Sequence, residues 1–75
     1  MRIIVARALW DAEAQVWSSV VEELHIFTEA PSIEALRERL KLIVPDVLEH
    51  TGETTGDVSI EIIAHVSDQV KLAAA

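Results

Sequence analysis

Two stretches, Trp10-Asp11-Ala12-Glu13-Ala14-Gln15-Val16-Trp17 and Thr28-Glu29-Ala30-Pro31-Ser32-Ile33-Glu34-Ala35-Leu36, decide the fold of this chain. The first predicts a tight hairpin, because a short polar connection joins two apolar runs. The second predicts a strand that leads into a helix capped by Ser32, with Glu34 placed where a negative charge favours the positive helix end. A strand before the hairpin and a strand after the helix complete a β-β-β-α-β order. We expect an α+β fold with a mainly antiparallel sheet and one helix on one face.

The first strand, residues 2–10, is apolar on both of its faces. Its even positions are Ile4, Ala6, Ala8 and Trp10, and its odd positions are Ile3, Val5, Arg7 and Leu9. One helix covers only one face of a sheet, so the odd-numbered residues are expected to form a second apolar face that needs covering. We therefore predict a homodimer whose interface contains Ile3, Val5 and Leu9.

The hairpin contains no glycine, although a loop of this length usually closes with a residue in the left-handed region. Gln15 lies where that residue falls, so we expect it to have a positive φ. The two tryptophans that flank the loop share the core parity of their strands, and we expect both in the core rather than stacked on a ligand. The second strand is Val16 to Val21, and the third is expected from His25 to Glu29, after the break at Glu22-Glu23.

The helix and the final strand are predicted from apolar residues that recur at two different spacings. The helix shows a stripe at helical spacing, interrupted by Pro45, where we expect a kink or a restart, with Pro45 opening a short final segment that stops near Gly52. Residues 58–66 instead alternate, which predicts a strand buried on one face. Its apolar positions are Val58, Ile60, Ile62, Ala64 and Val66. Residues 73–75 are expected to fray.

Composition limits the kinds of partner and site. The 75 residues suffice for a single domain, 1–75, and they contain no cysteine for disulfides or thiolate metal sites. The net charge of −7 argues against nucleic acid as the main partner and favours a basic protein, although such acidity can also simply keep a small domain in solution. No apolar run is long enough to span a membrane, and we expect a cytoplasmic protein.

No set of residues predicts catalysis. The acidic residues Asp11, Glu13, Glu22, Glu23 and Glu29 could be read as a two-metal cluster, but they fall at a turn and at strand ends, where polar residues are common. The three histidines are far apart in sequence, and no glycine-flanked turn presents a serine nucleophile. We expect no enzyme activity, no metal and no cofactor.

The element order, the Trp10-Asp11 to Val16-Trp17 hairpin, and the helix ending Ile43-Val44-Pro45-Asp46-Val47-Leu48 resemble the small bacterial family called domain of unknown function 1902. That family looks like a relative of the N-terminal domain of HicB antitoxins, a reduced version of the ribonuclease H fold. The family often has Gly where this chain has Gln15, and a Pro-Gly turn where it reads Leu24-His25. We expect neither the DNA-binding domain that HicB antitoxins often carry nor direct binding of nucleic acid.

The resemblance implies a HicB-like, antitoxin-related binding protein that masks a small basic ribonuclease toxin. We expect the acidic rim and a strand edge to contact this partner. The residues of this surface are Glu22, Glu23, His25, Ile26, Phe27 and Glu29. The alternative is a stand-alone homodimeric domain with an unknown ligand, and a third reading is an enzyme with a cryptic acidic site.

Overall fold

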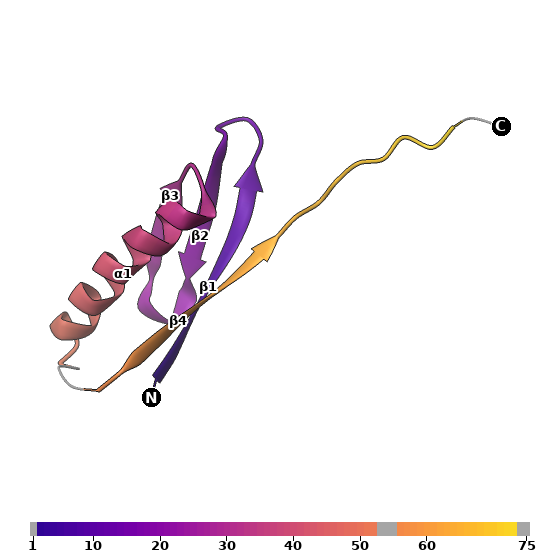
Figure 1. The fold of residues 1–75 in the computed structure, drawn as a ribbon. Helices are drawn as coiled ribbons and strands as arrows, with labels where there is room; N and C mark the ends of the chain where they lie inside the picture. Colours follow the sequence, from indigo (N-terminus) through magenta and orange to yellow (C-terminus); the bar gives the residue numbers. More distant parts are fainter. Residues whose placement is uncertain (1, 53–55, 74–75) are drawn as a thin grey trace.

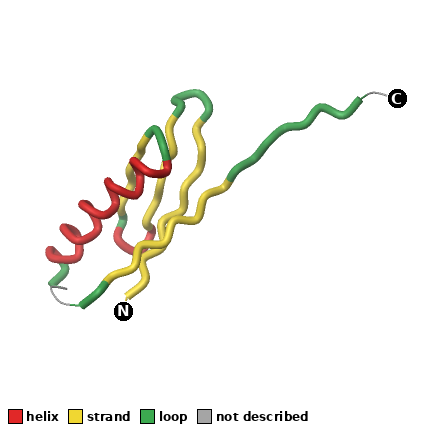
Figure 2. The backbone as a smooth tube through the Cα atoms, in the orientation of Figure 1, coloured by secondary structure: helices red, strands yellow, loops and turns green. Residues whose placement is uncertain are grey.

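The computed structural model describes residues 2–52 and 56–73, and they form one sheet with one long helix against it (Figures 1 and 2). The elements are β1 (Arg2–Asp11), β2 (Val16–Val21), the 3-10 turn η1 (Glu22–Leu24), β3 (Ile26–Ala30), α1 (Ile33–His50) and β4 (Val58–His65). The strands lie in the order β3-β2-β1-β4. The predicted α+β fold and its β-β-β-α-β order are confirmed.

The sheet is mainly antiparallel, as expected. β2 pairs antiparallel with β1 and with β3, whereas β4 returns after the helix and pairs parallel with β1. β1 is therefore an inner strand, and β3 and β4 form the two edges of the sheet.

The core lies between α1 and one face of the sheet. The even-numbered residues of β1 point into it, and Ile4, Ala6 and Ala8 are fully buried. The helix contributes a stripe spaced by four residues, Leu36, Leu40, Val44 and Leu48. Ser32 Oγ accepts a hydrogen bond from Ala35 N at 3.1 Å, so the predicted N-cap is confirmed.

Pro45 does not restart the helix. α1 is one helix from Ile33 to His50 with Pro45 inside it, so the separate final segment expected from the sequence is wrong. Val44 and Leu48 are both buried, and their packing on the sheet holds the turns on either side of the proline in register. The helix ends just before Gly52, as expected.

The hairpin has the predicted backbone. Gln15 has a φ of 58°, and its N–H donates to the Asp11 carbonyl at 2.8 Å. The Asp11 carboxylate accepts from the N–H groups of Glu13 and Ala14, at 3.0 and 3.2 Å. The polar loop thus satisfies its own backbone groups.

The tryptophans divide between core and surface. Trp17 packs against the core, but Trp10 is 42% exposed, so its assignment to the core was wrong. Their rings meet across the hairpin at a centroid distance of 5.5 Å. The hairpin reaches beyond the first turn of α1 (Figure 1), and Trp10 is the next to last residue of the strand that leads into it.

The two edge strands also differ from expectation. β3 begins at Ile26, because His25 closes η1 in the left-handed conformation with a φ of 54°. In β4 the apolar parity predicted to be buried is only partly covered: Ile60 and Ile62 are half-buried, and Val58 is 39% exposed. α1 packs mainly against β3, so the far edge of the sheet receives less of its cover.

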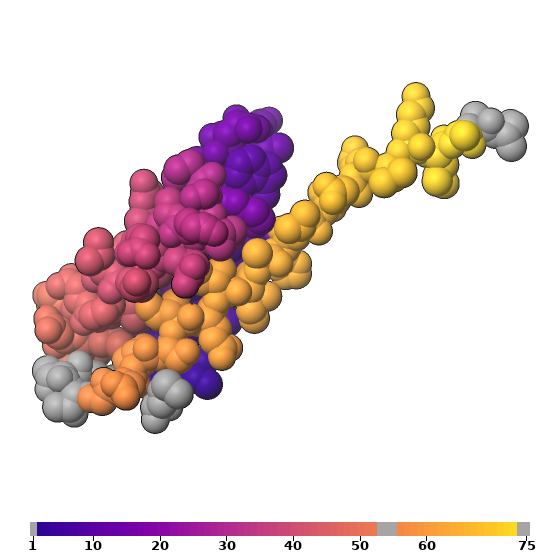
Figure 3. Space-filling view, viewed as in Figure 1, coloured from indigo at the N-terminus to yellow at the C-terminus, as the bar shows by residue number. Residues whose placement is uncertain are grey.

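Beyond β4 the chain continues as an extended segment that leaves the body of the molecule (Figures 1 and 3). We call residues 66–73 the C-terminal segment. The fraying predicted for residues 73–75 concerns mainly residues 74 and 75, which lie outside the described part of the chain. Among the described helices, none is long and apolar enough to cross a membrane.

Candidate functional site

The sheet face opposite α1 is uncovered in the single chain, and we call it the open face. The register brings its side chains into rows: Arg7 of β1 lies opposite Val20 of β2 and opposite Ile63 of β4. Six large apolar side chains, exposed by between 40 and 64%, lie on this face: Ile3, Val5, Leu9, Val20, Phe27 and Ile63. All four strands contribute, so the patch spans the sheet. An exposed set of apolar side chains of this kind is typical of an interaction surface.

The open face is hollowed near its middle. A depression of about 380 Å³ is lined by Leu9, Val20 and Phe27 together with Arg7 and other polar neighbours. Apolar walls with a few polar groups at the side suit an apolar side chain of a partner.

Two ion pairs join β1 to η1. Arg7 pairs with Glu22, and Arg2 pairs with Glu23 at 2.9 Å. All four side chains are substantially exposed, so each pair adds little to stability. Their effect is electrostatic: the two acids that the sequence placed on a free acidic rim are each matched by an arginine. The period-two pattern of β1 could not reveal these pairs, because they join residues 15 and 21 positions apart.

The structure brings together the three residues predicted at the dimer interface. Ile3, Val5 and Leu9 lie on the open face and are 51, 40 and 59% exposed. The second apolar face expected from the odd positions of β1 is thus present. Whether a second copy covers it stays a prediction.

The residues predicted to bind a partner do not all lie on one surface. Glu22 and Glu23 lie in η1, and Phe27 is 64% exposed on the open face. Ile26 points the other way and is only 7% exposed, because alternation along β3 sends it into the core beneath α1. It therefore cannot anchor a partner in this conformation, and we leave it out of the proposed surface.

β3 lies at an edge of the sheet, as the predicted strand-edge contact requires. Its outer edge is not wholly free, because the guanidinium of Arg39 donates to the main-chain carbonyl of Glu29. His25 occupies a left-handed turn at the start of this strand. The edge available to a partner is consequently short.

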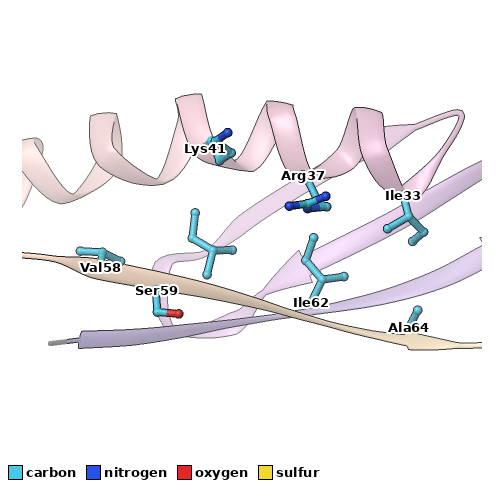
Figure 4. A pocket seen from close by; sticks show the side chains of 8 residues that line it. Ile33, Arg37, Lys41, Val58, Ser59, Ile62 and Ala64 are labelled. Atoms are coloured by element: carbon cyan, nitrogen blue, oxygen red, sulfur yellow. The ribbon is translucent and has the colours of Figure 1, made fainter.

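A second hollow lies between α1 and β4 (Figure 4). This groove has a volume of about 550 Å³. Its apolar lining includes Ile33, Ile60 and Ile62, and two cations of the helix, Arg37 and Lys41, also line it. Arg37 points from α1 toward β4 (Figure 4). Sequence reasoning missed the groove, since it assumed that α1 would cover β4 as fully as the other strands.

The described residues contain no group of three or more His, Asp or Glu side chains that could hold a metal ion. The three histidines lie at the ends of three different elements: His25 after η1, His50 at the end of α1 and His65 at the end of β4. The absence of enzyme activity stays a prediction.

The surroundings of His50 favour its protonated form. The pKa of His50 is raised above its ordinary value of 6.5, first by its hydrogen bond to the Asp46 carbonyl and then by the charge of the Asp46 carboxylate. The ring Nδ1 lies 2.8 Å from that carbonyl oxygen. The imidazolium also stands at the negative end of α1, where a cation is favoured.

Comparison with known proteins assigns the chain to a family. Residues 3–74 match the domain of unknown function (DUF1902). The chain belongs to this family. A solved structure has a similar fold: a hypothetical protein from the extremely thermophilic bacterium Thermus thermophilus is 31% identical, with a TM-score of 0.77. The match covers 92% of this chain and 100% of that one. No curated protein matches this DUF1902 chain.

Proposed function

We propose that this DUF1902 domain is a non-catalytic binding protein, related to HicB antitoxins, that masks a small basic ribonuclease toxin. The single observation that carries the proposal is the open face, a large apolar surface that the fold itself leaves uncovered. On this proposal the chemistry belongs to the partner, and this chain controls access to it.

The charge of the chain suits such a partner. The chain carries 13 acidic against 6 basic residues, so a basic protein is attracted from a distance. The ion pairs of Glu22 and Glu23 with arginines neutralise part of the rim. Apolar contacts at Phe27 and Leu9 therefore supply the lasting affinity, while net charge mainly speeds encounter.

The test is a pull-down from the native host followed by a ribonuclease assay on the captured protein. The wild type should capture a small basic protein and inhibit its cleavage of RNA. A Leu9→Asp, Phe27→Asp variant should lose both capture and inhibition, because it places two unpaired charges in the contact. Both positions are more than half exposed, at 59 and 64%, so the variant should still fold.

The matched control places a charge on another surface. Leu42 is 77% exposed on α1, and Leu42→Asp should capture and inhibit like the wild type. A captured protein without ribonuclease activity, or one retained equally by the Leu9→Asp, Phe27→Asp variant, would contradict the proposal.

The second candidate is a stand-alone homodimer that buries the same face on itself. Ile3 and Val5 favour it, since they continue the apolar patch to the end of β1 that lies away from the hairpin. Ile3→Lys with Val5→Lys should then give a monomer in analytical ultracentrifugation. A wild type that is monomeric at high micromolar concentration excludes this candidate.

A further inference from the structure

The C-terminal segment has the pattern of a strand without a partner. Val66, Val70 and Leu72 share one parity and are 72, 79 and 85% exposed, while the other parity carries Ser67, Gln69 and Lys71. Alternation of this kind is typical of a strand with one buried face. In the single chain the segment instead leaves the body of the molecule with its apolar side chains in solvent (Figure 3).

β4 presents a free edge beside this segment. It is the last strand of the sheet, and among the described residues only β1 pairs with it. Its outer N–H and C=O groups are therefore open to another strand. The same strand carries Ile60 and Ile62 half-exposed over the groove beneath α1. The C-terminal segment and β4 thus each carry apolar side chains at alternate positions that this chain alone does not cover.

The charged residues that line the groove indicate which kind of segment can bind there. Arg37 and Lys41 both line it, and Arg37 points toward β4 (Figure 4). Within the described residues Arg37 has no ion pair, and Lys41 has only a long contact of 3.4 Å to Glu38. On the apolar parity of the C-terminal segment, the one charged residue at positions 66–72 is Asp68. An acid flanked by valines therefore meets a groove that has an apolar floor and two cations.

We propose that two copies of this chain pair through β4 and the C-terminal segment, antiparallel about a two-fold axis at His65. Directly opposed residues of an antiparallel pair share a face of the sheet. Residue 66 then lies opposite residue 64 of the second copy, 68 opposite 62, and 70 opposite 60. Val70 consequently covers Ile60, and Asp68 enters the groove near Arg37.

The geometry favours a second copy as the occupant. The arrangement is isologous, because each copy supplies one segment and receives one, and such two-fold pairs are the commonest oligomers. The eight residues 66–73 match the eight residues of β4 in length. The axis stands perpendicular to the sheet, so both helices lie on one side and both open faces stay available. The pairing is therefore independent of the function proposed for the open face.

The first test is the oligomeric state of the whole chain by analytical ultracentrifugation. The wild type should be a dimer, and Val70→Asp with Leu72→Asp should weaken dimerisation by more than a hundredfold. Both side chains are about four-fifths exposed in the single chain, so the variant keeps its fold, which circular dichroism would check. The matched control, Ser67→Lys with Gln69→Lys, places two charges on the other parity, where residue 69 lies opposite Glu61 of the second copy, and should remain dimeric.

Charge reversal tests the groove. Asp68→Arg should weaken the dimer at least tenfold at low salt, and adding Arg37→Asp should restore most of the loss, because the two charges exchange places. A wild type that is monomeric at 100 µM or so overturns the proposal. So does a dimer that survives Val70→Asp with Leu72→Asp but dissociates on Ile3→Lys with Val5→Lys, which would assign the contact to the open face.

The absence of cysteine allows a positional test. A lone cysteine at the two-fold axis faces its own copy at the Cα separation that a disulfide accepts. His65→Cys should form a disulfide-linked dimer under mild oxidation, and Leu42→Cys on the exposed face of α1 should do so far more slowly. Equal rates for the two variants would contradict the register.

Discussion

At the scale of single residues, two side chains occupy backbone conformations that suit glycine. Gln15 has a φ of 58° and His25 a φ of 54°. A residue with a Cβ loses roughly 1 kcal/mol in the left-handed region relative to glycine. Gln15 recovers part of this loss, since its Nε2 donates to the Ala12 carbonyl at 2.6 Å. The described residues give the His25 side chain no such bond.

We predict that His25→Gly stabilises the fold by about 1 kcal/mol and Gln15→Gly by about 0.5 kcal/mol, because only the second change removes a hydrogen bond. Urea unfolding followed by circular dichroism measures both free energies. His25→Ala and Gln15→Ala serve as controls that keep the Cβ and should not stabilise. A loss of stability in His25→Gly would show that the side chain makes a contact beyond its turn.

Ser19 presents the opposite case, a polar group in the core. The residue is 1% exposed, and its Oγ has no hydrogen-bond partner among the described residues. Leaving such a group unsatisfied costs about 1 to 3 kcal/mol. It lies opposite Ala8 of β1, beneath the helix.

Ser19→Ala is therefore expected to raise the free energy of unfolding by about 1 kcal/mol, because it removes the unsatisfied hydroxyl and leaves a very small cavity. Ser18→Ala, one residue earlier and partly exposed on the open face, should change it by less than about 0.5 kcal/mol. Thermal and urea unfolding of the two variants would settle the comparison. A destabilised Ser19→Ala would mean that the hydroxyl finds a partner in solution.

At the scale of elements, α1 shows how packing overrides a local signal. Pro45 has no N–H, so the Lys41 carbonyl lacks its helical donor. The helix nevertheless continues, because the burial of Leu40, Val44 and Leu48 spans the break. Protonated His50 stabilises the last turn of α1. Its raised pKa means that the folded state binds the proton more tightly than the unfolded chain does.

The raised pKa of His50 determines how its contribution to stability changes with pH. Because the folded pKa lies above the ordinary 6.5, the stabilisation is fully present below pH 6.5 and is lost as pH rises through the folded pKa. His50→Asn should therefore destabilise the protein more at pH 5.5 or so than at about pH 8.5. NMR titration of the ring should give a midpoint above 6.5 in the wild type. A midpoint at or below that value would contradict the contact with Asp46.

At the scale of the whole molecule, one helix covers only part of a four-stranded sheet. The open face and the outer edge of β4 are left uncovered. A chain of 75 residues buries a modest share of its surface, so a second copy bound to either surface would contribute noticeably to stability. The open face and the β4 edge are separate candidates for such contact, and they lie at different parts of the same sheet.

Association through the C-terminal segment makes the melting temperature depend on protein concentration, because a dimer gains stability by mass action. We expect the wild type to melt several degrees higher at roughly 200 µM than at about 2 µM. Val70→Asp with Leu72→Asp should melt at the same temperature at both concentrations. A wild type that shows no concentration dependence would argue against any stable dimer.

The sequence alone determined the element order, the N-cap at Ser32 and the positive φ at Gln15, because each depends on residues within a few positions of one another. It also indicated that β1 is apolar on both faces. Only the tertiary structure decided which apolar residues are covered: Ile26 is buried, whereas Phe27 and Trp10 are exposed. It also decided that Arg7 meets Glu22 across 15 positions of sequence. Coverage depends on where one helix lies over a twisted sheet, and that is a property of long-range packing rather than of local pattern.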